Sequence, residues 1–159
     1  MSELDALYQQ IILDHAKARH GADLTAAEAA AVPDAPGVGQ SHQLNPVCGD
    51  EITVRLEVKG GQVETVRWHG DGCAISMASA SVLADLARGL DPAAFGQLID
   101  HFREVLRSRG SIAADEESLG DAAALSGVGR FPARVKCAML SWVAAEDALR
   151  RAEGSTRKD

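Results

Sequence analysis

Aromatic residues are scarce in this chain of 159 residues, at 4% of the sequence. The core must therefore be built from Leu, Ile, Val and Ala, and the chain is long enough for one compact domain with such a core. Positive charge is also short, because 16 Lys and Arg face 23 Asp and Glu and the net charge is −7. Nucleic-acid and anionic-membrane binders need a basic surface, so neither kind of partner is expected.

Long apolar runs are missing as well. No run approaches the roughly 20 residues that a membrane-spanning helix needs. The N-terminus reads Met-Ser-Glu-Leu-Asp, which is acidic where a secretory signal would be basic. We therefore expect a cytoplasmic protein.

Cysteines number only three, and an odd number cannot all pair within one chain. A lasting disulfide is not expected in a reducing compartment. Such cysteines are metal ligands, reactive thiols, or buried and inert small hydrophobes, and their count alone leaves these alternatives open.

The N-terminal segment of the chain has helical periodicity. Apolar residues recur at helical spacing from Ser2 to about Arg19, which predicts an amphipathic helix. The stretch 21–39 is rich in Ala, Pro and Gly and is expected to connect this helix to the next element, with a helical turn at 25–31.

A small antiparallel sheet is predicted next. A short strand is expected at 40–44, and apolar and polar residues alternate over 51–59. The pair Gly60-Gly61 favours a two-residue hairpin turn, and the return strand is expected at 62–69. Within that strand the apolar residues change phase, and a bulge near Glu64 would restore the alternation.

The remaining segments are predicted to be helical, with one long loop and a frayed tail. Their bounds are 73–88 and 91–109 for helices, 110–131 for a region that is mostly loop with a turn at 121–125, 132 to about 152 for the last helix, and 154–159 for the tail. This order predicts a single α+β domain over 1–159, in which helices pack on one face of an antiparallel sheet of about three strands.

The first two cysteines stand at predicted element boundaries. Cys48 precedes a strand, and Gly49 allows a turn that brings the Cys48 sulfur and the Asp50 carboxylate together. Asp50 can alternatively serve as a turn residue that caps local backbone. Cys73 begins a helix, where backbone N–H groups stabilise a thiolate.

The third cysteine, Cys137, lies in the first turns of the last helix. Arg134 and Lys136 flank it in sequence, and nearby cations would lower the pKa of its thiol. The alternative is a core-facing cysteine in helical register with Leu140, Ser141 and Ala144.

Together the cysteines and Asp50 supply the four ligands that zinc prefers. Three thiolates and one carboxylate carry a charge of −4, so Arg134 and Lys136 are candidates to balance the site, with Arg134 the stronger candidate to support the ligands. The spacing is not that of a zinc finger. His42, the nearest histidine to Cys48 in sequence, is expected beside the site or at a partner surface rather than on the metal.

Four segments resemble the SufU branch of the IscU-like proteins, whose domain is also known as the NifU N-terminal domain. They are LYQQIILDH at 7–15, NPVCGD at 45–50, GDGCAISMASAS at 70–81 and FPARVKCAMLSW at 131–142. The resemblance implies an α+β fold and a zinc site formed by Cys48, Asp50, Cys73 and Cys137. It also implies a PLP-dependent cysteine desulfurase of the SufS type as partner, with Cys48 accepting its persulfide sulfur for downstream Suf cluster-assembly proteins.

Two features favour the sulfur-transfer branch within this resemblance. IscU-like scaffolds have His directly before the last cysteine, whereas this chain has Lys136, and the predicted helix 91–109 fits an insertion of SufU-like chains. Three functions follow as hypotheses: a zinc-dependent sulfurtransferase, a scaffold that assembles and transfers an Fe–S cluster, and a non-catalytic module with structural zinc. The stretch 21–39 is longer than is typical of the family, and this departure bears on the docking of the first helix and the shape of the partner surface, not on the site.

Overall fold

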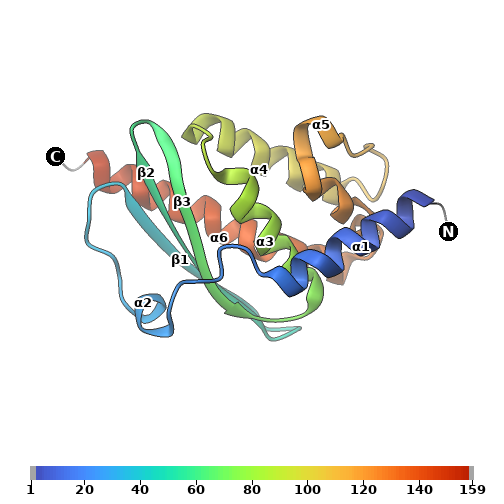
Figure 1. Ribbon diagram of the computed structural model, residues 1–159, viewed down its shortest axis with the longest axis horizontal. Helices are drawn as coiled ribbons and strands as arrows, with labels where there is room; N and C mark the ends of the chain where they lie inside the picture. The colour runs from blue at the N-terminus through green and yellow to red at the C-terminus, as the bar shows by residue number, and fades with distance from the viewer. Residues whose placement is uncertain (1–2, 158–159) are drawn as a thin grey trace.

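The computed structural model describes residues 3–157, with side chains through Gly154. A three-stranded sheet lies against several helices (Figure 1). The elements are α1 Glu3–Ala18, α2 Ala26–Ala30, β1 Val38–Asn45, β2 Asp50–Lys59, β3 Gln62–Asp71, α3 Ala74–Ala87, α4 Pro92–Arg107, α5 Glu116–Leu119, the 3₁₀ segment η1 Gly120–Arg130, and α6 Pro132–Arg157. The predicted α+β fold is confirmed.

The sheet is antiparallel throughout, in the order β1-β2-β3. In the β2–β3 hairpin, Glu57 pairs with Thr65 but Val58 pairs with Val63, so Glu64 is the extra residue. The predicted bulge is confirmed, and it lets residues on both sides of it point into the core.

One face of the sheet carries the core. The side chains that alternate onto it are at most 1% exposed: Ile52, Val54, Leu56, Val66 and Trp68. Helix α6 packs across β1 and β2, and α3 packs on β3. Where β1 meets α6 the two backbones touch, because a Cβ on Gly39 would lie 1.9 Å from the Ala148 carbonyl oxygen. Glycine is therefore the residue that allows this approach.

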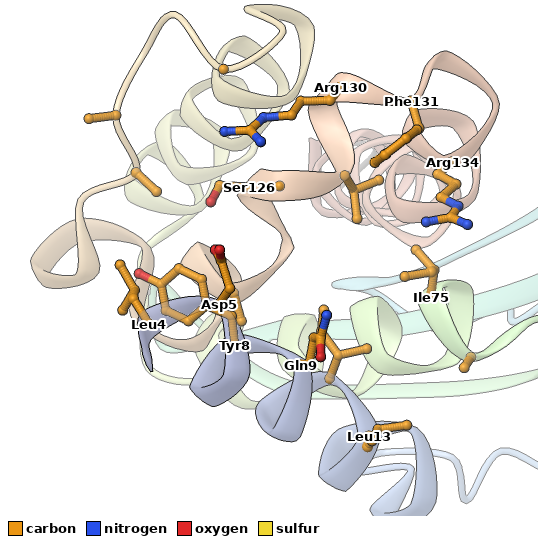
Figure 2. A pocket seen from close by; sticks show the side chains of 18 of the residues that line it. Leu4, Asp5, Tyr8, Gln9, Leu13, Ile75, Ser126, Arg130, Phe131 and Arg134 are labelled. Carbon is orange, nitrogen blue, oxygen red and sulfur yellow. The ribbon is translucent and has the colours of Figure 1, made fainter. Parts of the chain in front are cut away.

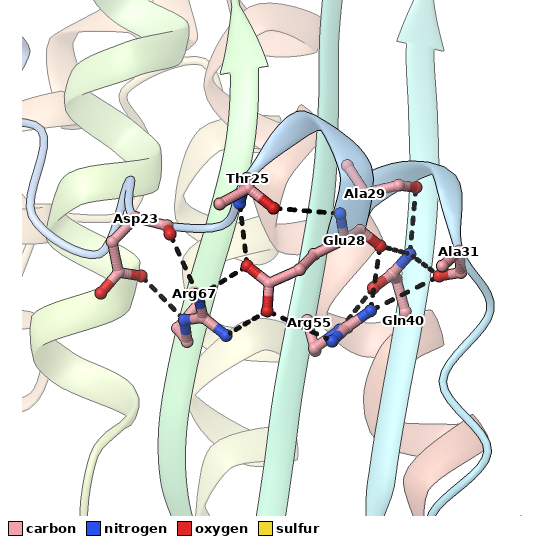
Figure 3. A network of polar contacts seen from close by, with 8 residues as sticks. All are labelled: Asp23, Thr25, Glu28, Ala29, Ala31, Gln40, Arg55 and Arg67. Carbon is pink, nitrogen blue, oxygen red and sulfur yellow. Dashed lines mark hydrogen bonds and ion pairs between the residues drawn. The ribbon is translucent and has the colours of Figure 1, made fainter.

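The short helix α2 packs on part of the opposite face, which the expected one-sided arrangement did not include. Gln40, Arg55 and Arg67 are cross-strand neighbours on this face. They hold α2 through its carbonyl groups and the Glu28 carboxylate (Figure 3). Thr25 and Glu28 form a capping box that begins the helix. Hydrogen bonds to its carbonyl groups and ion pairs with Glu28 hold α2 to the sheet.

The region 110–131 is not the loop that its glycines predicted. It forms α5 and the long 3₁₀ segment η1, with the expected turn 121–125 inside η1. Four consecutive residues of η1 are buried, Ala122 to Leu125. Buried backbone needs hydrogen-bond partners, and short-range 3₁₀ bonds supply them.

The chain ends also differ in their bounds. Helix α6 runs to Arg157 rather than ending near Ala152, so 154–157 are helical and not a frayed tail. The last two residues, and Ser2 of the first predicted helix, lie outside the described residues. Within 3–157, no helix combines the length and apolarity needed to cross a membrane.

Candidate metal centre

Three element ends converge on the candidate centre: the start of β2, the start of α3 and the first turns of α6. Cys48 lies in the turn between β1 and β2, where Gly49 has a φ of 76° and its amide donates to the Asn45 carbonyl at 2.7 Å. This left-handed conformation favours glycine. The tight Cys-Gly-Asp turn predicted from the sequence is confirmed.

Asp50 is the centre of the hydrogen bonding at this point. Its side chain is buried, Oδ1 accepts from the Cys73 amide at 3.0 Å, and Oδ2 accepts from the Ser76 hydroxyl at 2.7 Å. Gly72 leaves room for this carboxylate, since a Cβ there would lie 2.6 Å from Oδ1. Asp50 therefore binds the backbone at the start of α3, which is distant in sequence, rather than capping local backbone, and it also faces the cysteines.

The pKa of Asp50 lies below its ordinary value. Burial by itself would raise this pKa, but hydrogen bonds from Ser76, from the Cys137 thiol and from Cys73 outweigh burial. Asp50 is consequently an ionised carboxylate beside the thiols, which is the state that a metal ligand requires.

The thiols lie around one cavity of about 350 Å³, lined by Cys48, Gly49, Asp50, Asp71, Gly72, Cys73 and Cys137. Cys48, Asp50 and Cys137 each offer a ligand atom, and these atoms lie within 4.8 Å of one another. Cys73 stands outside that group of three, with Sγ 3.8 Å from Oδ2 of Asp50. The structure thus brings all four predicted residues to one cavity.

The spacing of the Cys48 and Cys137 sulfurs suits a tetrahedral zinc ion. The sulfurs of Cys48 and Cys137 are 3.6 Å apart. Zn–S bonds of about 2.3 Å place tetrahedral sulfurs about 3.8 Å apart. Three sulfurs and one carboxylate form a donor set typical of zinc, so the residues present fit this ion.

The expectation that Arg134 and Lys136 lower the pKa of Cys137 is wrong for the metal-free chain. Burial raises the pKa of Cys137, and hydrogen bonds to Asp50 and Cys48 and neighbouring negative charge raise it further. Both cationic side chains are exposed and face elsewhere: the Arg134 guanidinium lies 4.8 Å from the Phe131 ring centre, and Lys136 lines a groove beside Val47. A bound zinc ion deprotonates a coordinating thiol outright, which the flanking cations do not achieve here.

Ser76 is a part of the site that sequence reasoning missed. Its hydroxyl lies 2.7 Å from Asp50 Oδ2 and 3.2 Å from the Cys137 carbonyl oxygen, and so links β2, α3 and α6. The sequence feature that could have identified Ser76 is its position three residues after Cys73, on the same helix face. His42, in contrast, bonds to Glu51 at 2.7 Å on the exposed edge strand and does not line the cavity.

A larger groove of about 770 Å³ begins beside the cysteine cavity. It runs between α1, the start of α3, η1 and the start of α6. Figure 2 shows Tyr8, Gln9 and Leu13 of α1 on one side and Arg130 and Arg134 on the other. The groove reaches the cysteine site through Ala74 and Ile75, which follow Cys73.

Comparison with known proteins identifies the family. The NifU-like N-terminal domain model matches residues 7–138, which include all four candidate ligands. The chain belongs to this family. The predicted resemblance is therefore confirmed, and the family domain covers the sheet and the ends of α3 and α6 that form the cavity.

Relatives in this NifU-like family carry two kinds of name. The zinc-dependent sulfurtransferase SufU of Bacillus subtilis is 37% identical over 96% of this chain and 96% of its own length. The iron–sulfur cluster assembly scaffold protein IscU of Streptococcus pyogenes is 33% identical over 95% of this chain and 87% of its own. The crystal structure of a nitrogen-fixing NifU-like protein (N-terminal) from Brucella abortus superposes with a TM-score of 0.74 at 26% identity, covering 96% of this chain and 99% of that one.

Proposed function

We propose that this NifU-like protein is a zinc-dependent sulfurtransferase of iron–sulfur cluster assembly. It accepts persulfide sulfur on Cys48 from a PLP-dependent cysteine desulfurase of the SufS type and passes it to downstream Suf cluster-assembly proteins in the cytoplasm. The observation that carries the proposal is the exposed Cys48 thiol, 3.6 Å from the buried Cys137 thiol and beside an ionised carboxylate.

Cys48 is the ligand best placed to leave a metal. It lies in an exposed turn next to Gly49, where a Cβ would meet no atom within 4 Å, so no neighbouring side chain blocks this turn. Cys73 is also exposed, but its amide is bound to Asp50 and its sulfur contacts Ser76 at 3.7 Å. Cys137 is buried in a helix. Of the three thiols, Cys48 can therefore reach a partner with the smallest rearrangement.

Cys48, Asp50, Cys73 and Cys137 would hold the zinc ion, which keeps its thiol ligands deprotonated at neutral pH. The Cys48 thiolate attacks the outer sulfur of the desulfurase persulfide. A new S–S bond forms at Cys48, the old S–S bond breaks, and the desulfurase cysteine leaves as a thiolate while the proton stays on the transferred sulfur. The step needs no external oxidant or reductant.

The lining of the groove beside the cavity indicates the chemistry of a docking partner. Leu4 and Leu13 of α1 line it and are 49% and 51% exposed, so its apolar wall has no cover from the described residues. Arg130 and Arg134 line it too, and among the side chains described, through Gly154, neither guanidinium pairs with a carboxylate. We propose that it receives a desulfurase segment in which apolar side chains adjoin carboxylates.

A cluster scaffold is the alternative that the Streptococcus pyogenes relative favours, because the same ligands can hold iron. The position before the last cysteine argues for sulfur transfer instead. Lys136 is exposed and lines a groove with Val47 and Leu140, so this position offers the cavity no histidine ligand.

The experiment combines zinc content, desulfurase stimulation and intact-protein mass. We expect one zinc per chain, and a mass increase of one sulfur atom after incubation with desulfurase and cysteine. The variant Cys48→Ser should lose both the adduct and the stimulation, while His69→Ala, an exposed change outside the cavity, keeps both. Full stimulation by Cys48→Ser would refute the proposal. A stable cluster that transfers stoichiometrically after anaerobic reconstitution would favour the scaffold, and zinc without any sulfur adduct would indicate a structural module.

A further inference from the structure

We propose a second metal site in this protein, formed by His15, His20 and Asp85, which takes a borderline divalent cation such as Zn²⁺ or Co²⁺. One donor atom from each of these residues lies within 4.8 Å of the others. Two imidazoles and a carboxylate are a typical donor set for such ions, with water completing the coordination. The site lies outside the cysteine cavity and is independent of the proposed sulfur transfer.

The three residues come from separate parts of the chain. His15 is in the last turn of α1, His20 follows that helix, and Asp85 is in the last turn of α3. Asp85 lies twelve residues beyond Cys73, which corresponds to about 18 Å along a helix. The two candidate sites are therefore at opposite ends of α3.

His15 is held in one orientation from both sides. It is 7% exposed, its Nε2 lies 2.9 Å from Asp121 Oδ2, and its Nδ1 lies 2.8 Å from Ser81 Oγ. The same Ser81 oxygen accepts from the His20 amide at 3.0 Å, which places Nδ1 on the side of His20. We therefore assign Nδ1 as the ligand atom, with a cation displacing the Ser81 hydroxyl. Asp121 then keeps its bond to Nε2, as carboxylates do behind metal-bound histidines.

His20 and Asp85 form the open side of the site. His20 Nδ1 is 2.7 Å from Asp85 Oδ2, and the two side chains are 48% and 49% exposed, so an ion can enter from solvent. The two imidazole rings meet edge to face, with centres 5.2 Å apart. A cation would replace the proton shared by His20 and Asp85 and draw in His15. The bound cation would join the end of α1 to α3. It would thereby stabilise α1, which forms one wall of the groove beside the cysteine cavity.

The test uses the full-length chain and Co²⁺ as the probe. The wild type should bind two Co²⁺ per chain, of which one shows thiolate-to-metal charge-transfer absorption. The double variant Cys48→Ser/Cys137→Ser leaves only Cys73 and Asp50 of the cysteine site, so it should lose most of the thiolate absorption and keep one Co²⁺ at the histidine site. In that background, His20→Ala and Asp85→Asn should weaken Co²⁺ binding at least about tenfold, and Asp121→Asn, which removes a positioning carboxylate, by about 10- to 100-fold.

The matched control is His69→Ala, because His69 is exposed and lies outside both candidate sites. It should leave binding unchanged. Co²⁺ should also raise the melting temperature of the double cysteine variant, and His20→Ala should abolish that rise. The proposal is refuted if the double cysteine variant binds no Co²⁺ while its circular dichroism is native, or if His20→Ala binds Co²⁺ as well as its parent. In either case the three residues form only a hydrogen-bonded contact between the end of α1 and α3. Because two of the three thiol ligands, including the proposed acceptor Cys48, are absent in this background, failure here leaves the proposed sulfur transfer untouched.

Discussion

The Ser76 hydroxyl donates a hydrogen bond of 2.7 Å to Oδ2 of Asp50, and both side chains are buried next to the cysteine cavity. The same hydroxyl is 3.2 Å from the Cys137 carbonyl oxygen. A residue outside the expected ligand set therefore joins the carboxylate ligand to the helices that carry two of the thiol ligands.

The variant Ser76→Ala tests this relationship. It removes a hydrogen bond to a buried charged group, which costs about 1.5–3 kcal/mol of unfolding free energy. Because the bond from Ser76 also holds the pKa of Asp50 down, that pKa should rise in the variant. Urea denaturation of metal-free protein measures the loss, with Ser126→Ala as the control at a half-buried serine. Equal stability of Ser76→Ala and wild type would contradict the role of this bond.

Glu28 makes a stability contribution that depends on pH. Bidentate hydrogen bonds from Arg67, at 2.9 and 3.0 Å, and a hydrogen bond from the Thr25 amide together lower the pKa of Glu28 from 4.5 to about 2. The folded-state pKa is thus below the unfolded one. The contribution is complete above pH 4.5 and is lost as the pH falls from 4.5 to about 2.

The measurement is the urea midpoint as a function of pH for wild type and Glu28→Gln. We expect the variant to be less stable near neutrality and the two curves to converge in the window below pH 4.5. Glu64→Gln is the control, since Glu64 is exposed and makes no ion pair among the described residues. Parallel curves for wild type and Glu28→Gln would show that Arg67 does not hold this carboxylate.

The hairpin of this fold could be predicted from local sequence because each of its signals is local. Alternation over 51–59, the pair Gly60-Gly61 and the phase change at Glu64 each report on neighbouring residues. The position of α2 could not be predicted in this way. Its sequence is short and Ala-rich, and it is held by Arg55 and Arg67, which are 27 and 39 residues away from Glu28.

The cysteine cavity, like the fold, could be predicted only in part from local sequence. The turn at Gly49 and the start of α3 at Cys73 were predictable from residue type and spacing. The chemical state of Cys137 was not, because sequence neighbours such as Lys136 need not face the same side of a helix as the thiol. Tertiary burial and the approach of Asp50 set the pKa of Cys137 instead.

Gly39 and Gly96 are expected to respond with opposite signs to substitution by alanine. In Gly39→Ala the new Cβ would lie 1.9 Å from the Ala148 carbonyl oxygen and 2.6 Å from the Ala152 amide nitrogen, so β1 and α6 must separate. Overpacking of this kind costs about 1–3 kcal/mol or more. Gly96 lies in α4 with no atom within 4 Å of a Cβ, so Gly96→Ala should stabilise by up to about 1 kcal/mol. Thermal denaturation of both variants tests this expectation. If Gly39→Ala melts at the wild-type temperature, the sheet can shift against α6 without cost, and the prediction is wrong.

Arg130 should govern docking of the desulfurase without affecting the sulfur chemistry. Its guanidinium lines the groove beside the cysteine cavity but not the cavity itself. Under the proposed function, Arg130→Glu places a carboxylate where the partner presents carboxylates. A loss of about 1.4 kcal/mol would raise the concentration for half-maximal desulfurase stimulation about tenfold. The maximal stimulation should stay unchanged, because the interaction removed is one of binding alone.

The control for Arg130 is Arg88→Glu, which makes the same charge change at an exposed arginine that ends α3, away from Cys73. Half-maximal concentrations should differ between the two variants at low salt and converge as ionic strength rises, since exposed charges are screened beyond about 10 Å at 0.1 M salt. An equal effect of both variants would mean that only the net charge of the protein matters. A lower maximum with an unchanged half-maximal concentration would place Arg130 in the transfer step rather than on the docking surface.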